Sequence, residues 1–211
     1  MYISILGDSI STYEGYNPIG YEVFYKHERL IENHLTDVAD TWWMQVVKGM
    51  GGELCVNNSF SGSFVYETCE FSISAKERCQ SLHDGEKEPS AILVLAGTND
   101  CLGGITPTDF YNGYTTLLKR IRERYPTAKS YCATLTFGSN GKMEMTERGY
   151  SMLAAHNAAI KRAAEENGAA LIDLFEYKEY YPSNDGTHPN KDGHRWIAMR
   201  WLEQCKARGK V

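Results

Sequence analysis

The sequence contains no run of about 18 consecutive apolar residues, the minimum length for a helix that spans a membrane. The opening residues, Met1 to Gly7, also lack the basic segment and the long apolar core of a secretory signal peptide. We therefore expect a cytoplasmic protein that does not insert into a membrane.

The chain also has no excess of basic residues and no phosphate-binding loop. It carries 22 Lys and Arg residues against 27 Asp and Glu residues, and its formal net charge of −5 provides no positive field for a nucleic acid backbone. The Gly-rich patterns G-x-x-x-x-G-K and G-x-G-x-x-G are missing as well. We therefore expect no nucleic acid partner, and a flavin or nucleotide binder is disfavoured.

The six cysteines form no C-x-x-C pair and no Cys/His spacing of the kind found in zinc sites. We expect them to be small buried residues in a reducing compartment, rather than disulfide partners or metal ligands. No metal and no other cofactor is therefore predicted. The six residues are Cys55, Cys69, Cys79, Cys101, Cys132 and Cys205.

What the chain does contain is typical of a folded domain. Apolar residues make up 42% of the 211 residues and charged residues 23%. This length suits one domain over residues 1–211, which would bury roughly 70% of the surface of the unfolded chain. Five short apolar segments predict buried strands. They are Tyr2–Leu6, Glu53–Val56, Ala91–Ala96, Lys129–Thr134 and Ala170–Leu174.

Helical segments alternate with these strands. Apolar residues recur at helical spacing from Pro107 to just before Pro126, and further helices are predicted over Glu147–Asn167 and Asn190–Lys206. This alternation predicts an α/β fold in which helices cover both faces of a parallel sheet. Ligands bind such sheets at the carboxyl ends of the strands, so we look for functional residues just after each strand.

The segment from Ser11 to Asp40 shows no clear periodicity and follows the first strand. Long loops in compact domains are often functional, so this segment could cover the site, and short helices could lie within it. Trp42 and Trp43 open a predicted helix, with at least one ring in the core while the other could line the pocket. The aromatic rings of the segment could stack on a sugar or pack on one another. They are Tyr13, Tyr16, Tyr21, Phe24 and Tyr25.

Three residues that follow predicted strands can form a nucleophilic site. A serine hydroxyl becomes a nucleophile when an imidazole takes its proton, and a carboxylate holds that imidazole in the right tautomer. Ser9 follows the first strand, and Asp185 and His188 follow the fifth. Because two residues separate Asp185 from His188, both can lie on one turn. We predict Ser9 as nucleophile, His188 as base and Asp185 as its partner.

The same strand ends supply hydrogen-bond donors for an oxyanion, the negatively charged oxygen that forms during acyl transfer. The candidates are the backbone N–H groups of Ser9 and Gly62 and the side-chain amide of Asn99. Gly62 suits a turn whose N–H must approach a ligand closely, because glycine has no Cβ. The neighbouring carboxylates Asp8 and Asp100 are expected to be structural and to accept backbone N–H groups.

In these blocks the chain resembles the GDSL-type or SGNH hydrolases, whose four blocks begin with Ser, Gly, Asn and His. Here they read Gly7-Asp8-Ser9-Ile10-Ser11, Gly62, Gly97-Thr98-Asn99-Asp100 and Asp185-Gly186-Thr187-His188-Pro189, in that order along nearly the whole chain. The resemblance implies a flavodoxin-like three-layer α/β/α fold with a central parallel sheet of about five strands. It also implies ester hydrolysis, with the catalytic and oxyanion roles given above. The G-x-S-x-G elbow of the α/β-hydrolases is absent.

We therefore expect a serine esterase that removes a short acyl group, acetyl in particular, through an acyl-enzyme on Ser9. The expected partner is a small-molecule ester, such as an acylated carbohydrate, because the sequence shows no long apolar acyl channel. The resemblance also permits thioesterase or lysophospholipase activity. A non-catalytic binding module is a further alternative, which the intact Ser9, Asp185 and His188 oppose.

Overall fold

In the computed structural model, which describes residues 1–66, 71–139 and 146–207, five parallel strands form one sheet. Their order across the sheet is β2-β1-β3-β4-β6, and four of the five predicted strands end within one residue of the observed ones, the fifth within two. The predicted α/β fold is therefore confirmed. The strands are β1 (Tyr2–Gly7), β2 (Glu53–Asn57), β3 (Ala91–Leu95), β4 (Lys129–Ala133) and β6 (Ala170–Ile172).

The strand order places the end of β1 at a special position in the sheet. The chain moves from β1 to β2 on one side, and then crosses to β3 on the other side of β1. Connections on the two sides therefore leave in opposite directions, which opens a crevice at the carboxyl end of β1. The segment that follows β1 begins with Asp8 and Ser9.

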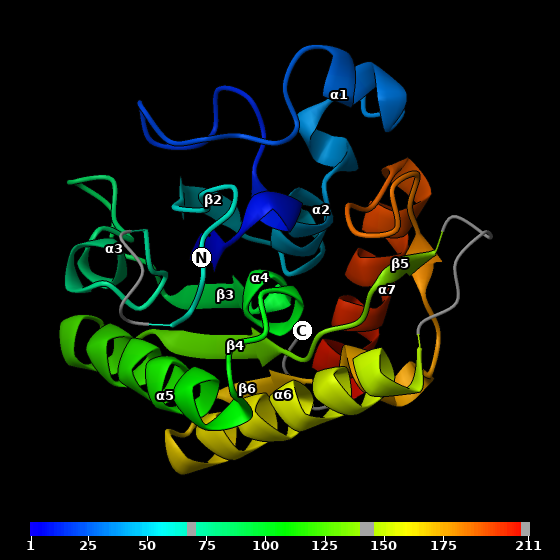
Figure 1. The fold of residues 1–211 in the computed structure, drawn as a ribbon. Coiled ribbons are helices and arrows are strands. Elements are labelled where there is room, and N and C mark those ends of the chain that lie inside the picture. Colours follow the sequence, from blue (N-terminus) through cyan, green and yellow to red (C-terminus); the bar gives the residue numbers. More distant parts are fainter. Residues whose placement is uncertain (67–70, 140–145, 208–211) are drawn as a thin grey trace.

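Helices cover both faces of the sheet (Figure 1). α5 (Pro107–Arg124) packs beside α6 (Glu147–Glu166), and α2 (Trp42–Gly49) packs beside α7 (Lys191–Ala207). The predicted helices match α5, α6 and α7 to within about a residue at each end. Thr106 caps α5 by accepting the N–H of Asp109, and Pro107 occupies the first helical turn. No helix within the described ranges is long and apolar enough to cross a membrane.

Several short helices and strands lie between the main strands and the long helices. α3 (Lys76–Gln80) contacts α5, and α4 (Thr98–Leu102) follows β3 directly. Strands β5 (Gly138–Ser139) and β7 (Tyr181–Pro182) pair in parallel as a second, two-stranded sheet. The remaining short helices are α1 (Glu28–Glu32), η1 (Ser9–Ser11), η2 (Val38–Asp40) and η3 (Leu174–Tyr177).

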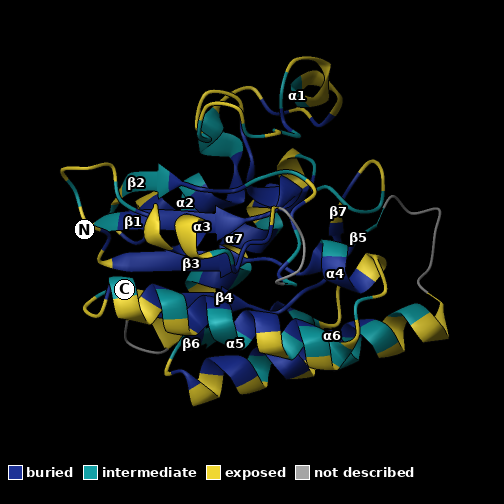
Figure 2. Cartoon of the chain, turned by 60° about the vertical axis from the view of Figure 1, so that its left-hand side comes forward, coloured by how far each residue is buried: buried dark blue, intermediate teal, exposed yellow. Residues whose placement is uncertain are grey.

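The core lies between the sheet and its helices, as the dark strands and light outer helix faces of Figure 2 show. Every residue of β3 is buried, which fits the continuous apolar run Ala91–Leu95 at the centre of a parallel sheet. α5 buries only one side, because its apolar residues recur at helical spacing. These residues are Phe110, Tyr114, Leu117, Leu118 and Ile121.

Both tryptophans of α2 belong to this core. Trp42 and Trp43 are 0% exposed. The Trp42 ring stacks on Trp201 of α7 with 4.9 Å between ring centroids, and Trp43 lies 5.9 Å from Tyr16. The expectation that one of the two rings lines the pocket is therefore wrong. α2 lies against both α7 and the sheet, so neighbouring residues at its start are covered from two sides.

The described cysteines also lie mainly inside the protein. Cys79, Cys101, Cys132 and Cys205 are buried, and Cys55 is half-buried, as expected from their apolar surroundings in the sequence. Burial raises the pKa of the Cys132 thiol to about 12 and that of Cys101 to about 11. These two thiols are therefore protonated and weakly nucleophilic at neutral pH. Cys69 lies outside the described residues.

Candidate active site

Ser9 occupies the crevice that the strand order predicts. Gly7 ends β1 and lies so close to β3 that a Cβ on it would come within 2.8 Å of the Leu95 carbonyl oxygen. Asp8 then caps the short helix η1, because its Oδ1 accepts the N–H of Ile10 at 3.0 Å. Ser9 follows as the first residue of η1 and is 6% exposed. The sheet and the cap thus fix the backbone on either side of the Ser9 hydroxyl.

The predicted partners of Ser9 meet it in the structure. Nε2 of His188 lies 2.9 Å from Oγ of Ser9, and Nδ1 of His188 lies 2.7 Å from Oδ2 of Asp185. Both distances are those of hydrogen bonds, so three residues from opposite ends of the chain form one continuous hydrogen-bonded chain. We call it the Ser-His-Asp chain.

The turn that carries Asp185 and His188 is held by its own hydrogen bonds. Oδ1 of Asp185 accepts the N–H groups of Thr187 at 2.9 Å and His188 at 2.7 Å. Partial burial raises the pKa of Asp185, but these N–H groups and the His188 imidazole lower it more, and the net pKa lies well below its ordinary value. Asp185 is therefore a carboxylate at every pH near neutrality and can fix the imidazole tautomer.

Two backbone N–H groups beside Ser9 are available to a ligand. Within the described part of the chain, the N–H groups of Ser9 and Gly62 donate to no other protein group. Gly62 has a φ of 83°, in the left-handed region that favours glycine, which turns the chain sharply between Phe60 and Ser63. The Ser9 N–H, in a residue that is 6% exposed, therefore calls for water or a ligand, and the Gly62 N–H lies in an exposed turn where a ligand can reach it.

Asn99 is joined to the same turn. Its Nδ2 donates to the carbonyl oxygen of Ser63 at 2.8 Å, which leaves the second amide hydrogen for another acceptor. The Phe60 N–H and the Ser63 hydroxyl bond the carbonyl of Gly7 at 3.2 Å and 3.4 Å. The turn that contains Gly62 is therefore tied both to Asn99 and to the residue two positions before Ser9. The structure brings the five predicted site residues into one neighbourhood.

The carboxylates next to Ser9 and Asn99, Asp8 and Asp100, differ in how many of their oxygens accept a hydrogen bond. Asp100 accepts the N–H groups of Val65 at 2.8 Å and Tyr66 at 3.0 Å, the bonding expected of a structural carboxylate. Asp8 uses Oδ1 for Ile10, but within the described residues its buried Oδ2 has no partner. Burial raises the pKa of Asp8 to about 6, although the Ile10 N–H and His188 oppose that rise.

Sequence reasoning missed Arg78, a buried arginine beneath the Gly62 turn. Its guanidinium donates to the carbonyl oxygens of Asn58 at 2.7 Å and Gly7 at 3.3 Å. Burial lowers the pKa of Arg78 to about 10, so the group keeps its charge at neutral pH. Arg78 thereby joins the end of β1 to the segment that leads into the turn. A single Arg in a short helix carries no signal in the sequence that would reveal this role.

Sequence reasoning also left open where the aromatic rings of the segment between Ser11 and Asp40 go. Phe24 stacks face to face on His188, with 3.5 Å between ring centroids and 10° between ring planes. Tyr13 and Tyr25 are buried, and Tyr21 lies 5.0 Å from Phe60. These rings therefore pack on one another and on the site, and of the five only Tyr16 is exposed.

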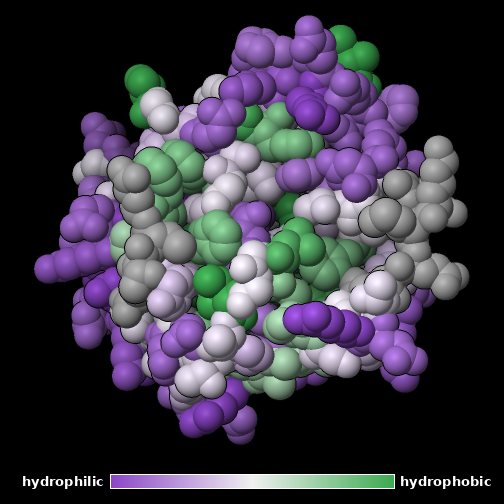
Figure 3. All heavy atoms as spheres, in the orientation of Figure 1, coloured by the Kyte–Doolittle hydropathy of each residue, from purple (hydrophilic) through white to green (hydrophobic). Residues whose placement is uncertain are grey.

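The surface around the Ser-His-Asp chain has an apolar side and a polar side. The rings of Phe60 and Phe71 stack with 4.7 Å between centroids, and Leu102 on α4 is exposed. Figure 3 shows hydrophobic side chains gathered near the middle of this face, with hydrophilic ones over its outer parts. On the other side, a cavity of about 350 Å³ borders the Asp185 turn. It is lined by Arg29, Glu32, Asn33, Asn184 and Asp185.

Comparison with known proteins agrees with this geometry. The sequence profile of the GDSL-like Lipase/Acylhydrolase family matches residues 1–204. A comparison with curated protein sequences finds no match.

Solved structures share the fold over nearly the whole chain. A candidate GDSL-like lipase from Bacteroides uniformis ATCC 8492 is 27% identical, with a TM-score of 0.72 over 98% of this chain and 95% of that chain. A second, from Bacteroides ovatus ATCC 8483, is 24% identical, with a TM-score of 0.70 over 98% of each chain.

A carbohydrate-active protein has a similar fold. An active-site mutant of a family two carbohydrate esterase from Clostridium thermocellum is 15% identical to this chain. Its TM-score is 0.67, and the match covers 100% of this chain and 64% of that chain. At this level of identity the match shows a common fold.

Proposed function

We propose that this chain, which belongs to the GDSL-like lipase/acylhydrolase family and is a carboxylic-ester hydrolase, works through an acyl-enzyme on Ser9. The observation that carries the proposal is the Ser-His-Asp chain, with distances of 2.9 Å and 2.7 Å, beside two N–H groups that have no partner among the described residues. A nucleophile, a base and oxyanion donors are the parts that acyl transfer requires.

The reaction follows from the positions of these groups. Oγ of Ser9 attacks the ester carbonyl carbon while its proton passes to Nε2 of His188, and Asp185 stabilises the imidazolium that forms. The carbonyl oxygen becomes an oxyanion, which accepts hydrogen bonds from the N–H groups of Ser9 and Gly62 and from the Asn99 amide. His188 then gives its proton to the leaving alcohol as the C–O bond breaks. Water, activated in turn by His188, releases the acid and restores Ser9.

The substrate that we propose is a short-chain acyl ester, acetyl in particular, of a carbohydrate or a similar polar alcohol. The cavity beside Asp185 is lined by charged and amide side chains, which suits a hydroxyl-rich alcohol. The apolar surface at Phe60 and Phe71 lies beside the Gly62 turn, where the acyl group would rest. A relative of the same fold is a carbohydrate esterase, which agrees with this choice.

The mechanism is tested by hydrolysis of p-nitrophenyl acetate with the wild-type protein and with Ser9→Ala, at equal folding judged by circular dichroism. We expect turnover that is lost in the variant. Equal rates in the two proteins would show that Ser9 is not the nucleophile.

The substrate class is tested separately with two comparisons. Rates on acetyl, butyryl and octanoyl esters should fall as the acyl chain lengthens, and a preference for octanoyl would favour a lipase or thioesterase role instead. Acetylated cello-oligosaccharides should be deacetylated faster than acetate esters of simple alcohols. Equal rates on both would remove the carbohydrate part of the proposal.

A further inference from the structure

The imidazole of His188 lies against a second ring that the reaction chemistry does not require. The face-to-face stack of Phe24 on His188 has centroids 3.5 Å apart and planes 10° from parallel. Phe24 comes from the segment between η1 and α1, more than 160 residues before His188 in the chain. The stack therefore depends on the path of this segment over the site.

Phe24 is itself held from several directions. Its N–H donates to Oγ1 of Thr12 at 2.9 Å, and the Thr12 hydroxyl donates to the carbonyl oxygen of Ser9 at 2.9 Å. The next residue, Tyr25, is buried and donates its hydroxyl to the carbonyl oxygen of Pro189 at 2.7 Å. Hydrogen bonds therefore connect Phe24 through Thr12 to Ser9, and its neighbour Tyr25 to the residue after His188.

The Phe24 ring has His188 and Arg29 as close neighbours. His188 covers one face, and the guanidinium of Arg29 lies over the ring at 5.2 Å from its centroid. Arg29 is also paired with Glu32 at 3.2 Å. The face that His188 covers is therefore not free to stack on a sugar.

We infer that Phe24 is a positioning residue, which holds the His188 imidazole in the plane where its two nitrogens meet Ser9 and Asp185. The inference rests on the proposed function, because it concerns the base of that reaction. Small displacements of reacting groups slow catalysis strongly. A Phe24 ring that restricts the motion of the His188 imidazole therefore raises the rate of ester hydrolysis.

The same contact also lies against the charge that forms on the base during the reaction. When His188 takes the Ser9 proton it becomes a cation against an aromatic face, an arrangement that ring quadrupoles stabilise. Other charges around the stack are Asp185 at Nδ1, the buried carboxyl of Asp8, and the Arg29–Glu32 pair, whose guanidinium lies near the Phe24 ring. Because neutral His188 gains less from the ring than the imidazolium does, the contact acts mainly on the transition state.

The test uses Phe24→Leu, which keeps an apolar side chain but removes the aromatic face, and Phe24→Tyr, which keeps that face. Phe24→Met serves as a second non-aromatic variant if Phe24→Leu folds poorly. We expect Phe24→Leu to lower kcat on p-nitrophenyl acetate about 10-fold, with KM within about 2-fold of wild type. Phe24→Tyr should retain most of the wild-type kcat.

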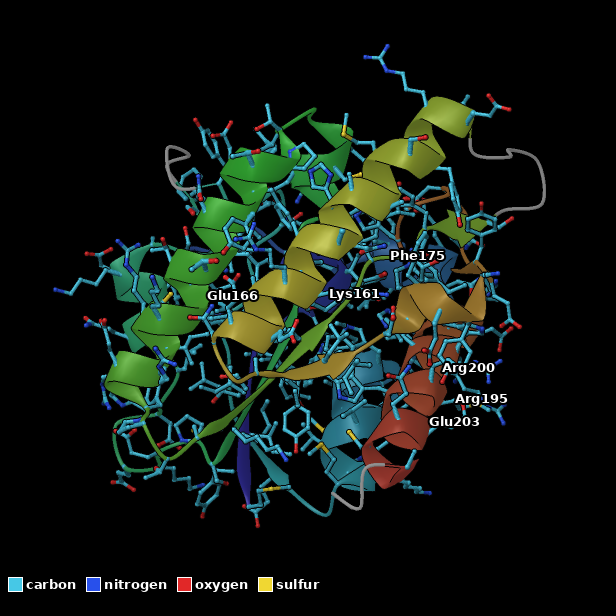
Figure 4. All side chains as sticks on the ribbon, turned by 90° about the horizontal axis from the view of Figure 1, so that it is seen from below. Lys161, Glu166, Phe175, Arg195, Arg200 and Glu203 are labelled. Carbon is cyan, nitrogen blue, oxygen red and sulfur yellow. The ribbon has the colours of Figure 1, made fainter. Side chains whose placement is uncertain are left out.

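A matched control removes another partly buried ring. The ring centroid of Phe175 on η3, labelled in Figure 4, lies 5.5 Å from that of Tyr150 on α6, and within the described part of the chain Phe175 makes no ring contact with His188. Phe175→Leu should lower the melting temperature about as much as Phe24→Leu, while its kcat stays at the wild-type value.

The outcomes separate this inference from the proposed function. A rise in KM without a fall in kcat for Phe24→Leu would make Phe24 a wall of the substrate pocket and overturn the inference. Wild-type kinetics in both Phe24→Leu and Phe24→Met would overturn it as well. If Ser9→Ala instead kept full activity, the proposed function would fail before Phe24 is considered.

Discussion

The two ends of the Ser-His-Asp chain are built in different ways. At one end, Ser9 is 6% exposed and follows β1, an interior strand of the sheet. At the other end, the side chains of His188 and Asp185 are 16% and 41% exposed, in a turn between β7 and α7. The nucleophile is therefore fixed by the sheet itself, whereas the base lies on a connection at the surface.

The attachments of the two ends differ accordingly. The end of β1 is held by pairing with β2 and β3, and its Gly7 carbonyl also accepts from the Phe60 N–H, the Ser63 hydroxyl and the Arg78 guanidinium. Besides its own hydrogen bonds, the His188 turn is held by side chains of the segment between Ser11 and Asp40: the Tyr25 hydroxyl bonds Pro189 and the Phe24 ring covers His188. Changes far from the chemistry should thus disturb the base more readily than the nucleophile.

Removal of the base gives the largest expected effect. His188→Ala leaves the Ser9 hydroxyl without a proton acceptor, so we expect kcat to fall about 10⁴- to 10⁶-fold. Steady-state hydrolysis of p-nitrophenyl acetate measures this loss, and circular dichroism checks that the fold persists. A loss of less than about 10-fold would mean that another group accepts the proton.

Asp185→Asn tests the partner of the base. The change removes the charge that stabilises the imidazolium and allows the wrong tautomer, so kcat should fall about 10²- to 10⁴-fold. Because the pKa of Asp185 lies well below its ordinary value, wild-type activity should show no acid limb from this group between pH 5 and 8. A variant with wild-type kcat would show that the exposed end of the Ser-His-Asp chain is dispensable.

Asn99→Ala tests the oxyanion donors beside Ser9, at the buried end of the Ser-His-Asp chain. Loss of one oxyanion donor should lower kcat about 10²- to 10³-fold while KM changes little. The bond to Ser63 is lost as well, so melting curves are needed beside the kinetics. An effect confined to KM would place Asn99 in substrate binding rather than at the oxyanion.

Asp8→Asn concerns stability at the nucleophile end. The folded protein holds the Asp8 pKa at about 6, above the ordinary value of 3.8 for an aspartate, so the uncharged acid favours folding below pH 4 and this contribution is lost as the pH rises through 6. Asparagine keeps an oxygen for the Ile10 N–H without the buried charge. Asp8→Asn should therefore exceed wild type in unfolding free energy by up to about 3 kcal/mol at pH 8.

Urea denaturation at several pH values tests this prediction. The difference between Asp8→Asn and wild type should shrink as the pH falls from 8 to 4, because the wild-type carboxyl becomes protonated. A difference that stays constant with pH would show that Asp8 does not titrate in this range.

Much of the sheet and of the site could be predicted from the sequence, because local patterns determine both. Continuous apolar segments such as Ala91–Leu95 identify strands, and the order of Ser9, Gly62, Asn99 and His188 identifies residues at strand ends. What could not be predicted depends on contacts between distant segments. Phe24 reaches His188 only because of the path that its segment takes across the site.

The short elements were missed for a related reason. α3 and α4 have five residues each, too few for a helical period to be visible in the sequence. The sequence allows one of Trp42 and Trp43 to line the pocket, but the burial of Trp43 depends on Tyr16 and on how α2 meets the sheet. The local pattern of aromatic residues in the sequence reveals neither the contact with Tyr16 nor the packing of α2 on the sheet.

The most direct test of the central claim is covalent labelling with an alkyl fluorophosphonate, followed by mass spectrometry of the digested protein. Such a reagent forms a stable bond with an activated serine and needs the same base as the ester reaction. We predict one phosphonyl group per chain, on the peptide that contains Ser9, formed far more slowly in His188→Ala. A label on another residue, or undiminished labelling of Ser9→Ala, would contradict the assignment of Ser9 as the nucleophile.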